Sequence, residues 1–261
     1  MPSTVAPPPS LRSSAVERVA AAYRAMAAAS PALRFEVGTP DAGGHDGDGP
    51  VAGRRLVRDP GALAALVAAE ERRVRDLYGV PPRRDVAPTW VLHRYAFTVS
   101  LAMSGPWYLA GCAPRLTPDG VTYDGRTRHL VVSPAEAATA RALDAQELRA
   151  AIAAHLGPVL ETFRPLVRRG EHGMWALVTD AVAQGLWHLG RAQGDPWPAV
   201  HAAEALLPGR TPPFTAAAAF RPDPAAPGEP TRTRAGCCLL YTLRPQEICS
   251  TCPRRGRPRT A

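Results

Sequence analysis

Two residue types are missing from this 261-residue chain, which contains neither lysine nor asparagine. All 31 basic residues are therefore arginine, against 23 acidic residues, and the formal net charge is +8. Alanine is abundant as well, and this combination is typical of GC-rich coding. Arginine then fills surface positions where other proteins use lysine, so the positive charge is weak evidence for a nucleic-acid partner.

Several function classes lack their sequence signatures. There is no internal repeat, no glycine-rich phosphate loop, no dinucleotide fingerprint and no G-x-S-x-G motif, which disfavours the enzymes that depend on them. Residues 1–12 lack the apolar core of a signal peptide, so we expect a cytoplasmic protein. The one uncharged run long enough to be weighed as a membrane span is Tyr95 to Pro114. Its hydroxyl side chains and Gly105-Pro106 favour a buried helix that ends at Ser104, followed by a turn or a second short helix.

Apolar spacing along the chain predicts a mainly α fold of the α+β class. Around the dipeptide Asp124-Gly125, short β-forming runs predict one hairpin near residues 120–133. The glycine-rich stretch from Gly38 to Pro50 is expected to be a mobile loop. The strongest helical pattern starts at Met174 and ends near Arg191. The expected helices cover residues 13–29, 60–78, 89–104, 144–155, 158–168, 174–191 and 196–207.

Cysteine is scarce, and four of the five cysteines lie in the last 25 residues, in the pattern C-C-x10-C-x-x-C-P. Cys249 and Cys252 have the spacing of a metal chelate. Cys237 and Cys238 are adjacent, and in an extended chain adjacent side chains point to opposite faces. Both thiolates can reach one site only on a turned backbone, which Gly236 makes accessible. The four cysteines therefore predict a metal site that includes a turn.

Three interpretations of this site differ in how well they fit the spacing. A single zinc ion prefers pairs of ligands separated by two to four residues, so an adjacent pair suits it poorly. Disulfides belong to oxidising compartments, which nothing in the sequence indicates. An iron–sulfur cluster offers four thiolate positions over a longer span and tolerates irregular spacing. The spacing favours the cluster and leaves zinc and redox-active thiols open.

The cysteine motif, preceded by Arg232 and Arg234, resembles the C-terminal signature of the FhuF-like ferric-siderophore reductases. The segment from Trp175 to Arg191, with its Trp-x-Leu-Gly-Arg end, is similar to the helix that precedes the motif in that family. One feature differs, because the family has a serine or threonine directly before the cysteine pair, whereas this chain has Ala235 and Gly236 after the arginine. The resemblance implies a 2Fe-2S cluster held by Cys237, Cys238, Cys249 and Cys252.

The resemblance also implies a function, namely a cytoplasmic ferric-siderophore reductase that reduces Fe(III) to Fe(II) and so releases iron. It implies no catalytic residue beyond the cluster ligands. The expected partners are a ferric siderophore of the hydroxamate type and a separate electron donor such as a ferredoxin or a flavin reductase. Peripheral association with a siderophore importer and the absence of a nucleic-acid partner are further expectations.

Two alternatives to the reductase stay open at this point. One is an iron–sulfur regulator that binds DNA, because Arg-Gly-Arg-Pro in the tail 254–261 is similar to a minor-groove AT-hook. The other is an electron-transfer protein with no substrate of its own. A zinc-stabilised interaction module is a third class, if the metal is zinc.

With the resemblance, the chain divides into five predicted segments. A flexible tail (1–12) precedes a helical siderophore-binding body (13–207). A tether rich in proline and alanine (208–230) then leads to the 2Fe-2S module (231–253) and a basic tail (254–261).

Other polar residues have weaker patterns. Asp180, Gln184, His188 and Arg191 recur at helical spacing, and a solvated helix face is favoured over a substrate cleft. For His188, a hydrogen-bonded boundary residue is favoured over a fifth metal ligand. Cys112 is expected to pack as a small buried hydrophobe. Two interpretations apply to Arg232, Arg234 and Arg244, which either raise the cluster potential or are exposed.

Overall fold

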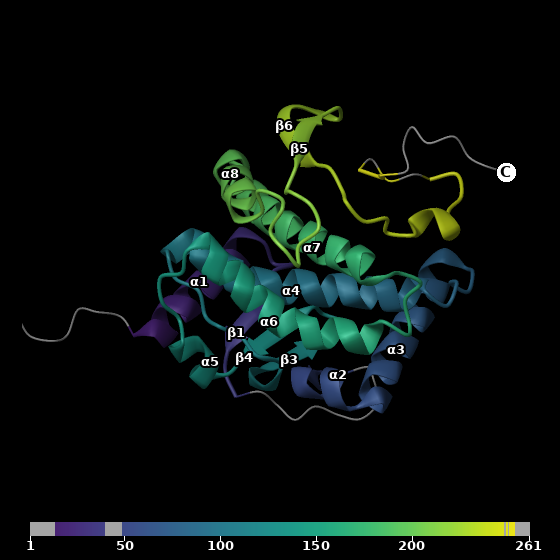
Figure 1. The fold of residues 1–261 in the computed structure, drawn as a ribbon, viewed down its shortest axis with the longest axis horizontal. Coiled ribbons are helices and arrows are strands. Elements are labelled where there is room, and N and C mark those ends of the chain that lie inside the picture. The colour runs from purple at the N-terminus through teal and green to yellow at the C-terminus, as the bar shows by residue number, and fades with distance from the viewer. Residues whose placement is uncertain (1–13, 40–48, 248, 250, 254–261) are drawn as a thin grey trace, which may run out of the picture.

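The computed structural model describes residues 14–39, 49–247, 249 and 251–253. The predicted mainly α fold of the α+β class is confirmed (Figure 1). The predicted tails 1–12 and 254–261 and most of the loop expected at 38–50 lie outside the described residues. The helices are α1 (Ala15–Ala29), α2 (Gly53–Arg58), α3 (Pro60–Tyr78), α4 (Val86–Ala110), α5 (Pro134–Ala138), α6 (Ala145–Phe163), α7 (Glu171–Ala192) and α8 (Trp197–Leu206).

A small mixed sheet lies against the helices. The predicted hairpin is confirmed as β3 (Val121–Asp124) and β4 (His129–Val132), which pair antiparallel. Two strands that the sequence did not indicate complete the sheet: β1 (Phe35–Val37) pairs parallel with β4, and β2 (Val51–Ala52) pairs antiparallel with β3. At three and two residues, these strands are too short to show an alternating pattern.

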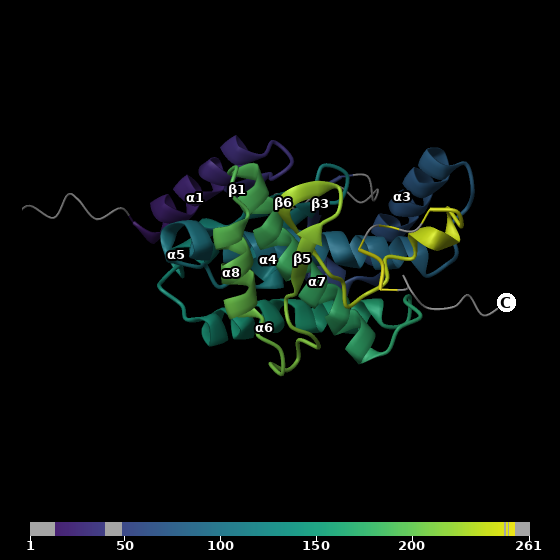
Figure 2. The same cartoon turned by 90° about the horizontal axis from the view of Figure 1, so that it is seen from above.

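Helix α4 is the centre of the molecule, because it contacts α1, α3, α6 and α7 (Figures 1 and 2). The apolar face predicted on α7 is buried along its whole length, including Trp175, Val182 and Leu189. Most of the other side chains on α7 are also buried, which shows that this helix packs between layers rather than at the surface.

The expected helix end at Ser104 is wrong, because α4 continues through Gly105 and Pro106 to Ala110. Proline has no backbone N–H, so the carbonyl of Ala102 loses its helical partner. The hydroxyl of Tyr23 on α1 donates to this carbonyl at 3.0 Å and replaces the missing bond. Gly105 allows close approach, since a Cβ there would lie 2.6 Å from the Met26 sulfur. Tertiary contacts with α1 therefore stabilise a helix that the local sequence disfavours.

The two helices expected at 144–155 and 158–168 form one helix, α6, with Pro158 inside it. Ala154, whose carbonyl would receive the missing N–H bond, is exposed, and so is Pro158. Water can satisfy that carbonyl, so the helix does not have to end there.

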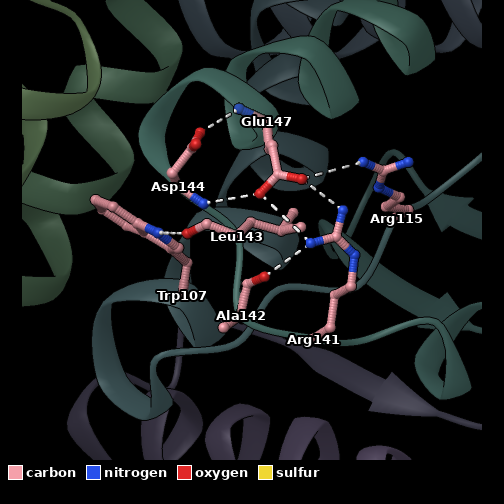
Figure 3. Close-up of polar contacts among 7 residues, drawn as sticks. All are labelled: Trp107, Arg115, Arg141, Ala142, Leu143, Asp144 and Glu147. Atoms are coloured by element: carbon pink, nitrogen blue, oxygen red, sulfur yellow. Dashed lines mark hydrogen bonds and ion pairs between the residues drawn. The ribbon is translucent and has the colours of Figure 1, made fainter.

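The start of α6 has a capping box. Asp144 accepts from the Glu147 backbone N–H at 2.8 Å, and the Glu147 carboxylate accepts from the Asp144 backbone N–H at 3.1 Å (Figure 3). Arg141 donates to the same carboxylate at 2.6 Å. The Trp107 indole donates to the Leu143 carbonyl at 2.9 Å and joins the end of α4 to this turn. These contacts fix α6 against α4 at the end remote from the cysteines.

The segment expected to be a tether, 208–230, is packed over part of its length. Phe214 is buried with its ring 5.5 Å from that of Trp175. Strands β5 (Phe220–Asp223) and β6 (Ala226–Arg232) form a hairpin, and the Trp187 indole donates to the Pro230 carbonyl at 2.9 Å. The chain therefore reaches the cysteines from a hairpin attached to α7.

Among the helices of the described residues, none combines the length and the hydropathy that a membrane crossing requires.

Candidate metal centre

The entry to the cysteine segment is anchored on Asp180, in the middle of α7. Its carboxylate accepts from the backbone N–H groups of Ala235 and Gly236, both at 2.8 Å. Arg234 lies 3.7 Å from the same carboxylate, and both side chains are buried. A Cβ at position 236 would lie 3.1 Å from Asp180 and from Leu177, so glycine allows this close approach. The solvated face expected for Asp180 is wrong.

The two residues that differ from the family pattern, Ala235 and Gly236, thus bind the helical body through their backbone. Burial raises the pKa of the Asp180 carboxyl, while the two N–H groups and Arg234 oppose that shift. These contacts fix the chain one residue before the first cysteine of the pair.

The carbonyl oxygens of the adjacent cysteines are both bound by side chains of the helical body. The Trp90 indole on α4 donates to the Cys238 carbonyl at 2.6 Å. The Arg169 guanidinium, in the loop between α6 and α7, donates to the Cys237 carbonyl. Two separate elements of the body therefore hold the backbone of the pair, and neither residue was predicted from the sequence.

A left-handed turn lies directly after the cysteine pair, at Leu239 rather than at Gly236. Leu239 has a φ of 64°, in the left-handed region, which costs a non-glycine residue about 1–2 kcal/mol. Its side chain is buried in a small apolar cluster with Val74, Val86 and Leu243. Burial of this leucine offsets the backbone cost. The cysteine segment therefore rests on the end of α3 and the start of α4, as both views show (Figures 1 and 2).

The thiols lie near one another. The sulfurs of Cys238 and Cys249 are 3.8 Å apart, and two thiolates held about 2.3 Å from one tetrahedral metal ion would have about that separation. Cys252 acts electrostatically on both Cys237 and Cys249. Burial, and then the neighbouring Cys238, raise the pKa of Cys249 to about 12. Such thiols need a cation to become thiolates.

Within the described residues, no three His, Cys, Asp or Glu side chains are gathered around a single point. The closest pair, Cys238 and Cys249, joins the two halves of the motif. All five cysteines are free thiols.

Arginines with buried nitrogen atoms lie next to the thiols and fit a negatively charged group. Burial, and then the charge of Arg234, lower the pKa of Arg232 to about 10, while Cys249 and Cys238 act in the opposite direction. The Nη1 atom of Arg232 and the Nε atoms of Arg169 and Arg234 are buried without a hydrogen-bond partner in the part of the chain that the structure describes. Four thiolates around two ferric ions and two sulfides have about two negative charges. The donor set and its surroundings therefore fit a 2Fe-2S cluster.

A cavity of about 230 Å³ lies between the cysteine segment and the helical body, beside the contacts that join them. Several of its polar atoms, including Thr89 Oγ1, are buried without a partner among the described residues. Burial, and then Arg234 and Arg232, lower the pKa of His93 to about 3, so this ring is neutral near pH 7. The lining includes His93 and Arg94 of α4, Gln184 of α7, and Arg232, Arg234 and Cys238 of the C-terminal segment.

The other predicted residues are distributed more widely. Cys112 is buried, as expected. His188 lies 3.4 Å from Ser30 and beside Phe97, as expected of a boundary residue. Arg244 is exposed and stacks over Tyr78. Of the three arginines weighed for the cluster, only Arg232 and Arg234 are beside it.

Four thiols on a turned segment, set among buried arginines, define the class of the protein as an iron–sulfur protein. A comparison with protein families agrees, since residues 234–254 match the family model described as FhuF 2Fe-2S C-terminal domain. The chain therefore contains this domain, with a 2Fe-2S cluster as its cofactor, and the resemblance seen in the cysteine motif is confirmed. The matched stretch is the segment that contains the four clustered cysteines. No curated protein matches the chain.

Proposed function

We propose that this protein reduces the iron of ferric siderophores by one electron and thereby releases it. The observation that supports this most is the cavity against Cys238, between the cysteine segment and helices α4 and α7. In this proposal Cys237, Cys238, Cys249 and Cys252 are the cluster ligands, and a bound 2Fe-2S cluster supplies single electrons. The cavity gives an electron acceptor access to one ligand cysteine.

The chemistry requires little of the protein beyond binding and position. Siderophores hold Fe(III) through hard oxygen donors, and one added electron gives the larger, less highly charged Fe(II), which those donors hold more weakly. No proton transfer and no nucleophile is needed. The roles of the chain are then to hold the cysteine pair through Trp90 and Arg169, and to seat the chelate at the mouth of the cavity between α7 and the cysteine segment.

The electron must come from a second protein, because the sequence has no nucleotide or flavin motif. We infer a ferredoxin or a flavin reductase as donor, and a chelate of the hydroxamate type as acceptor. The free thiols suit a reducing compartment, so we infer that the protein acts in the cytoplasm and associates peripherally with a siderophore importer.

A single-turnover experiment tests the function. Protein purified without oxygen, reduced chemically and freed of reductant, is mixed with a ferric hydroxamate and a chromogenic ferrous chelator. We expect about one trapped Fe(II) per cluster, since the cluster gives one electron. Cluster-free protein is the matched control. Release of Fe(II) no faster than with this control would contradict the proposal.

A further inference from the structure

The arginines around the cavity beside Cys238 have more positive charge than the neighbouring carboxylates neutralise. On the α4 side, Glu70 accepts from Arg73 at 2.8 and 2.7 Å and also pairs with Arg94, so one carboxylate serves two guanidinium groups. On the other side, Asp180 is the one carboxylate that pairs with Arg234 among the described residues, and Arg232 lies near it as well.

An oxidised cluster does not remove this excess. Asp85 acts on Arg169 as well, but Asp85 is paired with Arg83, and that pair is neutral. Apart from that pair, two carboxylates around the centre, Glu70 and Asp180, face five arginines, namely Arg73, Arg94, Arg169, Arg232 and Arg234. About two negative charges of a 2Fe-2S cluster on four thiolates leave about one positive charge over. In a partly desolvated cavity, such a charge selects strongly for an anion.

The chemistry of the lining restricts the anion further. Guanidinium groups only donate hydrogen bonds, and their planar fork matches the two oxygens of a carboxylate. The Arg94 Nε and the Arg232 Nη1 are buried without partners in the described chain, as is the Thr89 hydroxyl. A carboxylate accepts only, so it would satisfy these donors, whereas an ammonium group would be repelled.

The volume sets how much of a ligand can enter. At about 230 Å³ the cavity is small for a whole siderophore and large enough for one or two carboxylate groups. The chelated iron would then stay at the mouth of the cavity. Cys238 is part of the lining, so such a carboxylate would lie next to a proposed cluster ligand.

We propose that this cavity binds a free carboxylate of the ferric chelate, and that the protein therefore prefers siderophores with carboxylates beyond those bound to iron, such as citrate-based hydroxamates with side-chain carboxylates, over neutral trihydroxamates. This inference rests on the proposed function, since it specifies the substrate class for the same site. Arg94 and Arg232 are its binding residues.

Gallium(III) complexes separate binding from electron transfer, because gallium(III) is not reduced under these conditions. We would titrate oxidised holoprotein by calorimetry with the gallium complex of a citrate-based dihydroxamate that has free side-chain carboxylates and with that of a neutral cyclic trihydroxamate. We expect the carboxylate complex to bind about tenfold more tightly or better, as one charge-assisted contact predicts. Equal affinities would overturn the inference. The inference would also be overturned if free citrate bound as tightly as the gallium complex of the carboxylate siderophore, because the site would then be a general anion site.

Variants place the effect on the cavity. Arg94→Gln leaves Glu70 paired with Arg73, and we expect it to weaken the carboxylate complex about tenfold while changing the trihydroxamate less than twofold. Arg24→Gln, at an exposed position of α1, is the control and should change neither. Equal weakening of both complexes by Arg94→Gln contradicts the inference. If Arg94→Gln loses its cluster absorbance, the affinities of the two complexes for the unaltered protein still test the inference.

The two proposals can fail separately. Tight binding of the gallium carboxylate complex without release of Fe(II) from the ferric one would refute the reductase and leave the carboxylate site. Release of Fe(II) without discrimination between the gallium complexes would refute the carboxylate site and leave the reductase.

Discussion

The adjacent cysteines are held through their carbonyl oxygens, which leaves both thiols available for a metal. Trp90 and Arg169 come from different elements, and each binds one of the two carbonyls. Leu239 turns the chain directly after the pair, and its side chain is buried. The arrangement explains how a pair with no spacer can serve one cluster.

Trp90 should therefore stabilise the cluster without being a ligand. Trp90→Phe keeps an aromatic ring at this position but removes the indole N–H, so the Cys238 carbonyl loses its donor, at a cost of about 1–3 kcal/mol. We expect the cluster to be lost to an iron chelator about tenfold faster, measured by the decay of visible absorbance. Trp107→Phe removes an equivalent bond to the Leu143 carbonyl, far from the cysteines, and should leave that rate unchanged. Equal rates in the two variants would refute the role of Trp90.

The ligand set itself is tested by serine substitutions. Replacing any one of Cys237, Cys238, Cys249 or Cys252 should abolish or strongly reduce the iron and sulfide content, because each supplies one of four thiolates. Cys112→Ser, at a buried site away from this group, should retain about two irons and two sulfides per chain. Loss of the cluster in Cys112→Ser would show that the ligands are assigned incorrectly.

The sequence predicted the four cysteines because their spacing is local. It did not predict Trp90, which lies 148 residues before the carbonyl that it binds. Asp180 was misjudged for the same reason, since helical spacing alone cannot tell a solvated carboxylate from one that accepts two distant N–H groups.

At the scale of the elements, prolines caused the main errors. Pro106 and Pro158 each indicate a helix end, yet α4 and α6 continue through them. In α4, the hydroxyl of Tyr23 on α1 replaces the hydrogen bond that Pro106 removes. In α6, the carbonyl left without a partner by Pro158 is exposed to solvent, so its loss costs little. Helix boundaries with strong local signals, such as Asp59 and Gly79 around α3, were predicted correctly.

Helices α4 and α6 are joined by a buried histidine that predicts a pH dependence. His155 lies 2.9 Å from the Tyr95 hydroxyl and 3.0 Å from the Leu116 carbonyl, and burial lowers its pKa from 6.5 to about 4. The unfolded chain therefore takes up a proton as the pH falls from about 6.5 to about 4, while the folded chain does not. Stability contributed by neutral His155 is present above this window and is lost as the pH falls through it.

Between pH 7.5 and 5.5 the loss should be about 1 kcal/mol in the free energy of unfolding, measured by urea titration of the helical circular dichroism signal. Glutamine at this position does not titrate, so the free energy of unfolding of His155→Gln should fall by about 1 kcal/mol less than that of the unaltered protein over the same pH range. Parallel pH profiles for the two proteins would refute the assignment to His155.

For the whole molecule, the FhuF 2Fe-2S motif indicated the cofactor, but the cavity could not be read from the sequence. Its walls come from α4, α7 and the segment after β6, which are brought together only by tertiary packing. The packed hairpin β5–β6 bears on function too, since it brings the cysteines to a defined face of the body. The division into body, tether and module remains a prediction.

The account depends most on electron transfer from the cluster to a ferric chelate. The direct measurement is anaerobic stopped-flow absorbance of the reduced cluster mixed with ferric siderophores, with oxygen as a positive control for reoxidation. The account predicts that a ferric siderophore restores the oxidised spectrum at a rate that rises with its concentration, and that Fe(II) forms in equal amount. A reduced cluster that oxygen reoxidises readily, and that no ferric siderophore reoxidises, would contradict it and indicate an electron carrier or a sensor.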